Sequence, residues 1–389
     1  MKIKVKPEDF IVKERLKVSL SNSGPYQVWL LKKVGANTLD VIRDIAMRNR
    51  LAFSQIGYCG LKDRHSVSYQ YISAPSGAIN VVKGVNYELS HCGYMDRQLN
   101  KKDLLENQFD VVVRDVALPD ELVLRELDSV NRFHLVNYYD EQRFGSARHG
   151  KGFVAKAIIE KNYRKALKLL IATPSKWDDK KTKAFKRCVA ENWGKWERCI
   201  ELAPTFWEKR VLEFLRVREF SNTTAKKALA LVDKTIVELC FNAYQAYVWN
   251  LVAERIVLDT LSDESLIKIP YLYGMFHFYR EIDEKTRSFF DTIEIPTISP
   301  KLKCEGYVGR VILDVIRDEG FESLPSLRSN VKGAIFRSHK RPFLVKPQVK
   351  FRKEWDEIYT GKSKWHFHFS LPPGSYATLV VKRVFYREL

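Results

Sequence analysis

The stretch GYCGLKDRHSVSYQYIS, residues 57–73, contains the most informative turn of this sequence. Within it, Asp63 lies between Lys62 and Arg64, in a turn that glycines mark before a strand-like run begins. Asp63 therefore has two interpretations. It is either a solvated turn residue with basic neighbours, or a carboxylate that a functional site keeps ionised.

The residues after this turn predict a half-exposed β-strand that presents aromatic rings. Val67, Tyr69 and Tyr71 alternate with Ser68 and Gln70, which is the period of two that a strand requires. Further strands are predicted within 1–34 and at 107–116, and helices at 36–49 and 120–133. The N-terminal part of the chain thus interleaves strands and helices.

The pattern changes near residue 156 and changes back near residue 335. The segment 223–258 predicts one or two long helices that begin at Thr223 or Thr224. Residues 264–335 predict short strands broken by prolines and glycines, and the end of the chain predicts a strand followed by a helix. These shifts predict an inserted domain at 156–334, within a domain built from 1–155 and 335–389.

The charge of the chain predicts a polyanionic partner. The 389 residues include 66 Lys and Arg against 47 Asp and Glu, which gives a net charge of +19. Nucleic acid is the leading partner for such an excess, and solubility alone is the weaker explanation. The start MKIKVKPEDF has no apolar core, and no long apolar run follows, so we expect a cytoplasmic protein without a membrane partner.

Several kinds of site are not indicated. The six cysteines form no C-x-x-C pair, so we expect reduced thiols and neither a zinc site nor a disulfide framework. His366 and His368 share one strand face, where an exposed strand explains them better than a metal does. Because no P-loop, G-x-G-x-x-G turn or H-E-x-x-H motif occurs, we expect no nucleotide, metal or other cofactor.

Four stretches, taken together, point to one family. They are KVKPEDFIVKE (4–14), GLKDRHSVSYQ (60–70), NYYDEQRFG (137–145) and LPPGSYAT (371–378), in this order. They resemble the tRNA pseudouridine synthase D (TruD) family, and NAYQAYVWNLVAERI (242–256) is similar to a helix of that family. The resemblance spans nearly the whole chain and is weakest across 160–235 and 260–335.

The resemblance implies an RNA pseudouridine synthase. Such an enzyme breaks the N-glycosidic bond of a uridine in RNA, turns the base over and rejoins it through carbon 5, without consuming a cofactor. The family's catalytic aspartate corresponds to Asp63, and its basic partner corresponds to Lys4. We therefore expect Lys4 to pair with an ionised Asp63, which either attacks the ribose or base or removes a ribose proton.

The resemblance also implies substrate contacts. Phe10 corresponds to an aromatic residue that meets the target uracil, although a core phenylalanine is an equally good explanation. Asn137 corresponds to a substrate-contacting position, where its amide could read the uracil edge or could serve a turn. Tyr139 falls where relatives often carry phenylalanine, so we expect stacking on the flipped uracil to matter more than the hydroxyl.

Four more positions belong to these motifs. Tyr376 corresponds to a substrate-contacting aromatic, next to Gly374 and Ser375, which resemble a helix start that could hold a phosphate or be a plain cap. Arg143 either contacts backbone phosphate or forms an internal ion pair. His65 and Gln70 are expected to have structural roles.

The fold implied is α+β, with a long mixed, mostly antiparallel sheet flanked by helices in a pseudouridine synthase domain, plus an inserted α/β domain that walls the cleft. The family's usual target is uridine 13 in the D-arm of tRNA. Phosphate contacts would supply the energy to extrude that base, and the lysine-rich segment 176–187 is either such a contact or a solvated helix face. Two alternatives are a non-catalytic RNA-binding protein on the same scaffold and a cofactor-dependent RNA methyltransferase.

Overall fold

The computed structural model describes all residues, 1–389, and divides them into two compact units. The first unit contains Met1–Leu135 and Val345–Leu389, and the second contains Val136–Leu344. The chain passes between them in the short strands β9 (Leu135–Val136) and β14 (Leu344–Val345). The predicted inserted domain, 156–334, lies within the second unit, and its distinct role stays a prediction.

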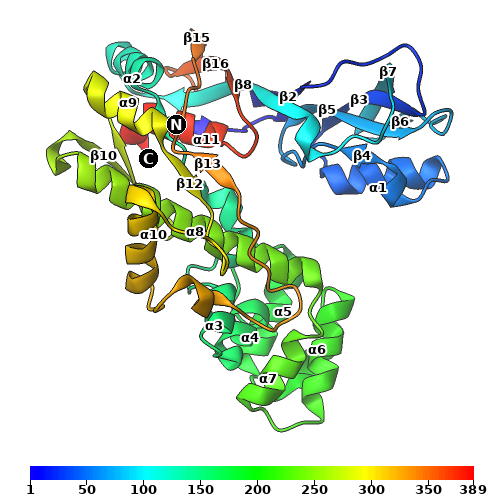
Figure 1. The fold of residues 1–389 in the computed structure, drawn as a ribbon. Coiled ribbons are helices and arrows are strands. Elements are labelled where there is room, and N and C mark those ends of the chain that lie inside the picture. The colour runs from blue at the N-terminus through cyan, green and yellow to red at the C-terminus, as the bar shows by residue number, and fades with distance from the viewer. The chain divides into compact units, whose positions relative to one another are not determined.

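The first unit is built on a ten-stranded mixed sheet, in the order β15-β16-β8-β2-β5-β3-β7-β6, with β1 on β8 and β4 on β5 (Figure 1). The strands are β1 (Lys2–Ile3), β2 (Phe10–Leu16), β3 (Tyr26–Val34), β4 (Gly57–Tyr58), β5 (Val67–Pro75), β6 (Lys83–Gly84), β7 (Tyr87–Met95), β8 (Leu104–Val116), β15 (Lys350–Trp355) and β16 (Ser363–Leu371). Only β2 and β5 pair in parallel. The predicted α+β architecture with a mostly antiparallel sheet is confirmed.

Three helices accompany this sheet: α1 (Thr38–Arg48), α2 (Asp120–Phe133) and α11 (Ala377–Val384). In α1, Val41, Ile42 and Ile45 recur at helical spacing and are buried against Leu31 and Ile72 of the sheet. Asn37 precedes the helix as its N-cap residue. This packing fixes α1 beside β3 and β5, and the Asp63 turn leads directly into β5.

The second unit is mainly helical and is organised around one long helix, α8 (Lys234–Thr260) (Figure 1). Buried residues occur all around α8, which is the pattern of a helix covered on every side. The other helices are α3 (Val154–Ile159), α4 (Tyr163–Ile171), α5 (Lys180–Glu191), α6 (Phe206–Arg216), α7 (Asn222–Leu229), α9 (Glu284–Thr292) and α10 (Gly306–Asp318). The predicted helical segment 223–258 is confirmed as two helices, α7 and α8, but the start predicted at Thr223 or Thr224 is wrong, because α7 begins at Asn222 with Ser221 as its cap.

Short strands complete this unit: β10 (Leu266–Tyr271) with β11 (Gly274–Tyr279), and β12 (Glu294–Pro296) with β13 (Lys340–Pro342). The prediction of short strands throughout 264–335 is wrong for α9 and α10. In α10, Val311, Ile312, Val315 and Ile316 are buried, so these β-branched residues follow a helical period. Gly309 permits this packing because a Cβ there would lie 2.6 Å from the Cys304 carbonyl carbon.

The expectation that all cysteines are reduced is wrong for one pair. Cys188 of α5 and Cys199 form a disulfide, with their Cα atoms 5.8 Å apart. The two residues are 11 positions apart, and only the packing of α5 on the following 3-10 turn, η5 (Trp196–Leu202), brings them together. None of the helices is long and apolar enough to cross a bilayer.

Candidate active site

Asp63 lies in the turn between β4 and β5, at an edge that the parallel pairing defines. β2 and β5 run in the same direction with Ile11 opposite Val67, so the segments that precede both strands meet at one edge of the sheet. Lys4 and Asp63 belong to these two segments. Lys4 Nζ lies 2.5 Å from Asp63 Oδ2, which is the ion pair that the sequence predicted.

This ion pair is partly exposed and rests on an aromatic ring. The side chains of Lys4 and Asp63 keep 23% and 19% of their surface exposed. Lys4 Nζ also lies 4.2 Å from the centre of the Phe10 ring, which is a cation–π contact. Phe10 is 3% exposed and packs edge-on against Phe109, so the structure makes it a core residue beneath Lys4.

The backbone of Lys4 is unusual. Its φ is +58°, in the left-handed region that residues with a side chain rarely adopt. Such a conformation persists only where surrounding contacts hold it, and it is enriched at functional sites. The contacts that hold it here are the ion pair with Asp63 and the stacking on Phe10.

The two basic neighbours of Asp63 do not serve its carboxylate in this geometry. Lys62 points inward and forms an ion pair with Glu14, whose side chain is completely buried. Glu14 also accepts a 2.8 Å hydrogen bond from the backbone N–H of Tyr71 in β5. Arg64 is exposed at the tip of the turn. Lys62 therefore neutralises a buried carboxylate and ties the turn to β2.

Lys33, which the sequence analysis did not single out, holds the backbone of the turn from below. Its Nζ donates hydrogen bonds to the carbonyls of Asp63 (2.7 Å) and Ala36 (2.9 Å). The side chain is 0% exposed, and this burial lowers the pKa of Lys33 to about 8, although the nearby Asp63 charge acts in the opposite direction. A second donor to the Asp63 carbonyl is the Ser66 hydroxyl at 2.8 Å.

A further set of hydrogen bonds fixes the rest of the turn. The Thr38 hydroxyl accepts from the Lys62 N–H (3.0 Å) and donates to Gln70 Oε1 (3.0 Å). Gln70 Nε2 donates to the Gly60 carbonyl at 3.3 Å. Gln70 is fully buried, which agrees with the structural role expected for it, and His65 is exposed. The turn that carries Asp63 is therefore held on both sides by buried polar groups.

The second unit gathers the other motif, at 137–145. Tyr139 is 4% exposed, with guanidinium groups near its ring: Arg341 at 4.2 Å and Arg143 at 5.5 Å from the ring centre. Trp249 meets the same ring edge-on. The Tyr139 hydroxyl lies 3.3 Å from His339 Nε2. Burial, together with Arg143 and Arg341, lowers the pKa of His339, which keeps this imidazole neutral near pH 7.

Asn137 is buried, and its amide is engaged within the protein. Its Nδ2 donates to the Pro342 carbonyl at 3.2 Å, and its Oδ1 accepts from Arg341 Nη2 at 2.6 Å. Arg341 also donates to the Asn137 carbonyl. Asn137 therefore links its own segment to β13 through buried hydrogen bonds. Arg143, for which phosphate contact and an internal ion pair were both open, stacks on Tyr139.

Tyr376 belongs to the first unit and is the N-cap residue of α11. The turn before it contains Gly374 with φ +85°, and the Ser375 N–H donates to the Pro372 carbonyl at 3.2 Å. The Ser375 hydroxyl is buried and has no hydrogen-bond partner. Tyr376 itself is partly exposed, so its ring is accessible for a contact of the predicted kind.

The structure thus forms two groups from the predicted residues. Lys4, Phe10 and Asp63 are in contact in the first unit, and Asn137, Tyr139 and Arg143 cluster in the second. The residues that sequence reasoning missed are Lys33, Glu14, Arg341 and His339. Lys33 alone carried a readable signal, because it occupies an inward position of β3, two residues after the buried Leu31.

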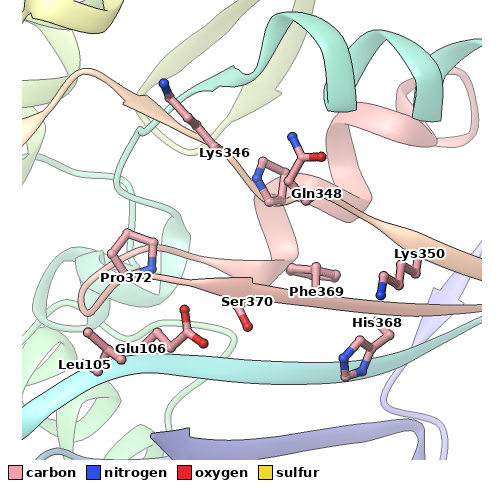
Figure 2. Close-up of a pocket in the computed structure, with 10 residues that line it drawn as sticks. Leu105, Glu106, Lys346, Gln348, Lys350, His368, Phe369, Ser370 and Pro372 are labelled. Atoms are coloured by element: carbon pink, nitrogen blue, oxygen red, sulfur yellow. The ribbon is translucent and has the colours of Figure 1, made fainter. Parts of the chain in front are cut away.

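A pocket of about 390 Å³ lies elsewhere in the first unit, and none of the predicted site residues lines it. Figure 2 shows Lys346 and Gln348 on the segment before β15, with Glu106, His368 and Ser370 on the neighbouring strands. His368 bonds to Asp110 at 2.5 Å, whereas His366 contacts Glu354 at 3.2 Å. These two histidines face different carboxylates, and no group of three or more His, Cys, Asp or Glu side chains is arranged to hold a metal ion.

Comparison with known proteins gives a consistent result. The family model of tRNA pseudouridine synthase D (TruD) matches residues 1–384. A Methanococcus maripaludis protein named "Probable tRNA pseudouridine synthase D 1" is 32% identical over 403 residues, covering 99% of both chains. The tRNA pseudouridine synthase D of Aquifex aeolicus is 31% identical, covering 99% of this chain and 98% of its own.

A solved structure shows the same fold. The crystal structure of a protein from Methanosarcina mazei, assigned to TruD, superposes with a TM-score of 0.72 at 22% identity. The match covers 99% of this chain and 93% of that chain.

Proposed function

Because the chain belongs to the tRNA pseudouridine synthase D (TruD) family, a family of RNA pseudouridine synthases, we propose that it isomerises a uridine of folded tRNA, at position 13 of the D-arm, with Asp63 as its catalytic carboxylate. The reaction needs no cofactor in this proposal. The observation that carries the assignment of Asp63 is its ion pair with Lys4, on the two motifs that resemble the family.

The geometry supports a role for Asp63 in three ways. The carboxylate keeps part of its surface exposed, as a group that must reach a substrate requires. Lys4 orients the carboxylate through Oδ2, and Lys33 and Ser66 anchor the backbone of Asp63 by donating hydrogen bonds to its carbonyl. A carboxylate fixed in this way loses little orientational freedom when the substrate binds, which is the condition for efficient covalent or proton-transfer chemistry.

Asp63 would act in one of two ways. Either an oxygen of the carboxylate attacks the ribose or the base, so that the glycosidic bond breaks while the nucleotide stays bound to the enzyme, or it removes a ribose proton. In both cases Lys4 balances the charge of Asp63 before the step, and the carboxylate becomes neutral when it forms the new bond or takes the proton. The proton at carbon 5 leaves after the base has been rejoined through that carbon.

The remaining residues have proposed supporting roles. Tyr376 would contact the substrate with its partly exposed ring. Phe10 would act through Lys4, because its ring is buried under the ammonium group. Asn137 and Tyr139 are proposed as substrate contacts on the strength of the motif, with Arg143 and Arg341 as the groups that position the Tyr139 ring.

The experiment uses an unmodified tRNA transcript that carries tritium at uridine carbon 5. Wild-type protein, Asp63→Asn and the control Asp115→Asn are incubated with it, and the modified position is then mapped. Asp115 is a matched control because it also pairs with a lysine, Lys2, at 3.0 Å in the same unit. We expect tritium release by the wild type and the control and no release by Asp63→Asn. We expect the modified nucleotide to be at position 13.

Other results would change the proposal. Tritium release by Asp63→Asn would show that another residue is the catalytic carboxylate. Modification at a position other than 13 would leave the proposed chemistry unchanged but would change the target uridine. Tight tRNA binding by the wild type without release from any tRNA would favour the non-catalytic RNA-binding protein. The presence of both Asp63 and Lys4 weighs against that alternative, since a protein that only binds RNA has no need of this ion pair.

A further inference from the structure

A second hollow lies in the second unit, and we call it the α6–α8 groove. It has a volume of about 530 Å³ and is lined by the first turn of α6, the turn between α7 and α8, and the segment that contains Lys332. Figure 1 shows α6 and α7 beside each other in this unit. None of the residues discussed above lines the groove.

The groove is positively charged. Three cationic side chains line it, Arg210, Lys234 and Lys332, against a single carboxylate, Asp233. Asp233 is committed to the backbone, because it caps α8 by accepting a 2.8 Å hydrogen bond from the Thr235 N–H. Lys234 pairs with Glu238 at 3.5 Å within α8, so the local excess of positive charge comes mainly from the exposed Arg210 and Lys332.

The groove also presents aromatic surface to solvent. Phe206, the first residue of α6, is 75% exposed, and Trp207 beside it is partly exposed. Arg210, one helical turn later, lies 5.6 Å from the centre of the Phe206 ring. An aromatic ring with an adjacent guanidinium group is the arrangement on which unstacked nucleobases bind, because the ring stacks on the base and the cation contacts the phosphate.

The backbone that carries these side chains is fixed. Gly333 has φ +86°, and a Cβ there would lie 2.8 Å from the Lys234 carbonyl oxygen. Lys332 is consequently held against the first turn of α8. The start of α6 is fixed by a capping box, in which buried Glu208 accepts from the N–H and hydroxyl of Thr205 at 3.0 and 2.7 Å.

We propose that the α6–α8 groove is an RNA-binding site, in which an unpaired base stacks on Phe206 while Arg210, Lys234 and Lys332 contact the adjacent phosphates. This inference rests on the proposed function, since it takes tRNA as the polyanion. Charge complementarity selects RNA: the groove is cationic in a chain whose net charge is +19, and its exposed ring suits a base.

The test measures the dissociation constant of an unmodified tRNA transcript at several salt concentrations. The variants are Phe206→Ala, Arg210→Ala and Lys332→Ala, with Phe289→Ala and Lys285→Ala of α9 as controls in the same unit. Phe289 and Lys285 are also exposed side chains, and neither lines the groove. Thermal melting of each variant verifies that it is folded.

The two kinds of variant have different expected signatures. Phe206→Ala weakens binding about 5- to 100-fold, with the slope of log Kd against log salt unchanged, because stacking is not ionic. Arg210→Ala and Lys332→Ala each reduce that slope by about 1, because each removes one phosphate contact. The controls bind within about twofold of wild type, and in tritium release the KM of each groove variant rises in step with its Kd.

The proposal is overturned if Phe206→Ala binds tRNA as tightly as wild type and the cationic variants keep the wild-type salt slope. It is also overturned if the groove variants lose affinity for poly-glutamate but not for tRNA, which would make the groove a site for an acidic polypeptide. These readouts need no catalysis. Failure of the proposed function, seen as no tritium release by wild-type protein, is therefore distinguishable from failure of this inference.

Discussion

Replacing Lys33 by methionine separates the stability of this protein from its activity. Lys33 does not touch the carboxylate of Asp63 but donates to its backbone carbonyl, so it is a positioning residue. Its side chain is fully buried, and the pKa of its ammonium group falls from 10.5 to about 8 because burial disfavours the charge. The fold therefore carries an energetic cost at neutral pH in order to hold this lysine.

The size of that cost follows from the pKa. The difference of about 2.5 between the two values corresponds to about 3.4 kcal/mol, at about 1.36 kcal/mol per pH unit. Below pH 8 both the folded and the unfolded protein hold the proton, and the full cost is present. Between pH 8 and 10.5 the folded protein releases the proton while the unfolded chain keeps it, so the free energy of unfolding increases with pH.

Methionine removes this cost but also removes two hydrogen bonds. The Asp63 carbonyl keeps the Ser66 hydroxyl as a donor, so the loss falls mainly on the Ala36 carbonyl, at about 1–3 kcal/mol. The two effects oppose each other. At pH 7 we therefore expect the free energy of unfolding of Lys33→Met to lie within about 2 kcal/mol of that of wild type. Its activity falls about 10- to 100-fold, because the turn that carries Asp63 loses one of its anchors.

The assay is urea-induced unfolding of both proteins at pH 7 and pH 10, with tritium release as the activity measurement. From pH 7 to pH 10, wild type gains about 2.5 kcal/mol relative to Lys33→Met, because only wild type contains the titrating group. Lys32→Met is the control, since Lys32 is the exposed neighbour on the same strand. The reasoning would be refuted if the difference in free energy of unfolding between wild type and Lys33→Met were the same at both pH values. Full activity of Lys33→Met would also refute it.

Three further substitutions test other parts of the structure. Lys62→Met leaves Glu14 buried and unpaired and lowers the free energy of unfolding by about 3–5 kcal/mol, and Glu14→Gln in the same chain restores part of it in urea unfolding. Cys188→Ser opens the disulfide with Cys199 and costs about 3 kcal/mol, so its melting temperature no longer responds to reductant as that of wild type does. Gly333→Ala places a Cβ at φ +86° and 2.8 Å from a carbonyl, and lowers the melting temperature in calorimetry, with a cost of about 1–3 kcal/mol.

Local periodicity was sufficient to predict much of the first unit. The alternation at 67–71 and the helical spacing at 36–49 correspond to β5 and α1, because each of these elements buries one face only. The same reasoning failed at 306–318, which lies within the segment predicted as short strands broken by prolines and glycines. Burial of the adjacent pairs Val311–Ile312 and Val315–Ile316, about one helical turn apart, is the pattern of a helix, and this burial depends on tertiary packing that the sequence does not display.

Some contacts of the candidate site could also be predicted from the sequence, and others could not. The contact between Lys4 and Asp63 could be predicted because the motif resemblance links two segments 59 residues apart. Arg341 and His339 could not be predicted, because each acts on a residue distant in sequence through a position that carries no motif. The inward position of Lys33 was readable from the strand pattern, but its partner, the Asp63 carbonyl, was not. The disulfide was missed because the two cysteines lie on different elements, whose packing alone decides that they meet.

The basic neighbours of Asp63 can now be explained by the directions of side chains. A buried ion pair such as Lys62 with Glu14 gains little stability, because the desolvation of both charges offsets their attraction. Breaking it is costly, however, so the pair fixes Lys62 inward. Lys62 is thus directed inward, to Glu14, whereas Asp63 keeps 19% of its side-chain surface exposed and pairs with Lys4. The lysine beside the carboxylate therefore anchors the turn to Glu14, while Lys4, distant in sequence, supplies the charge that pairs with Asp63.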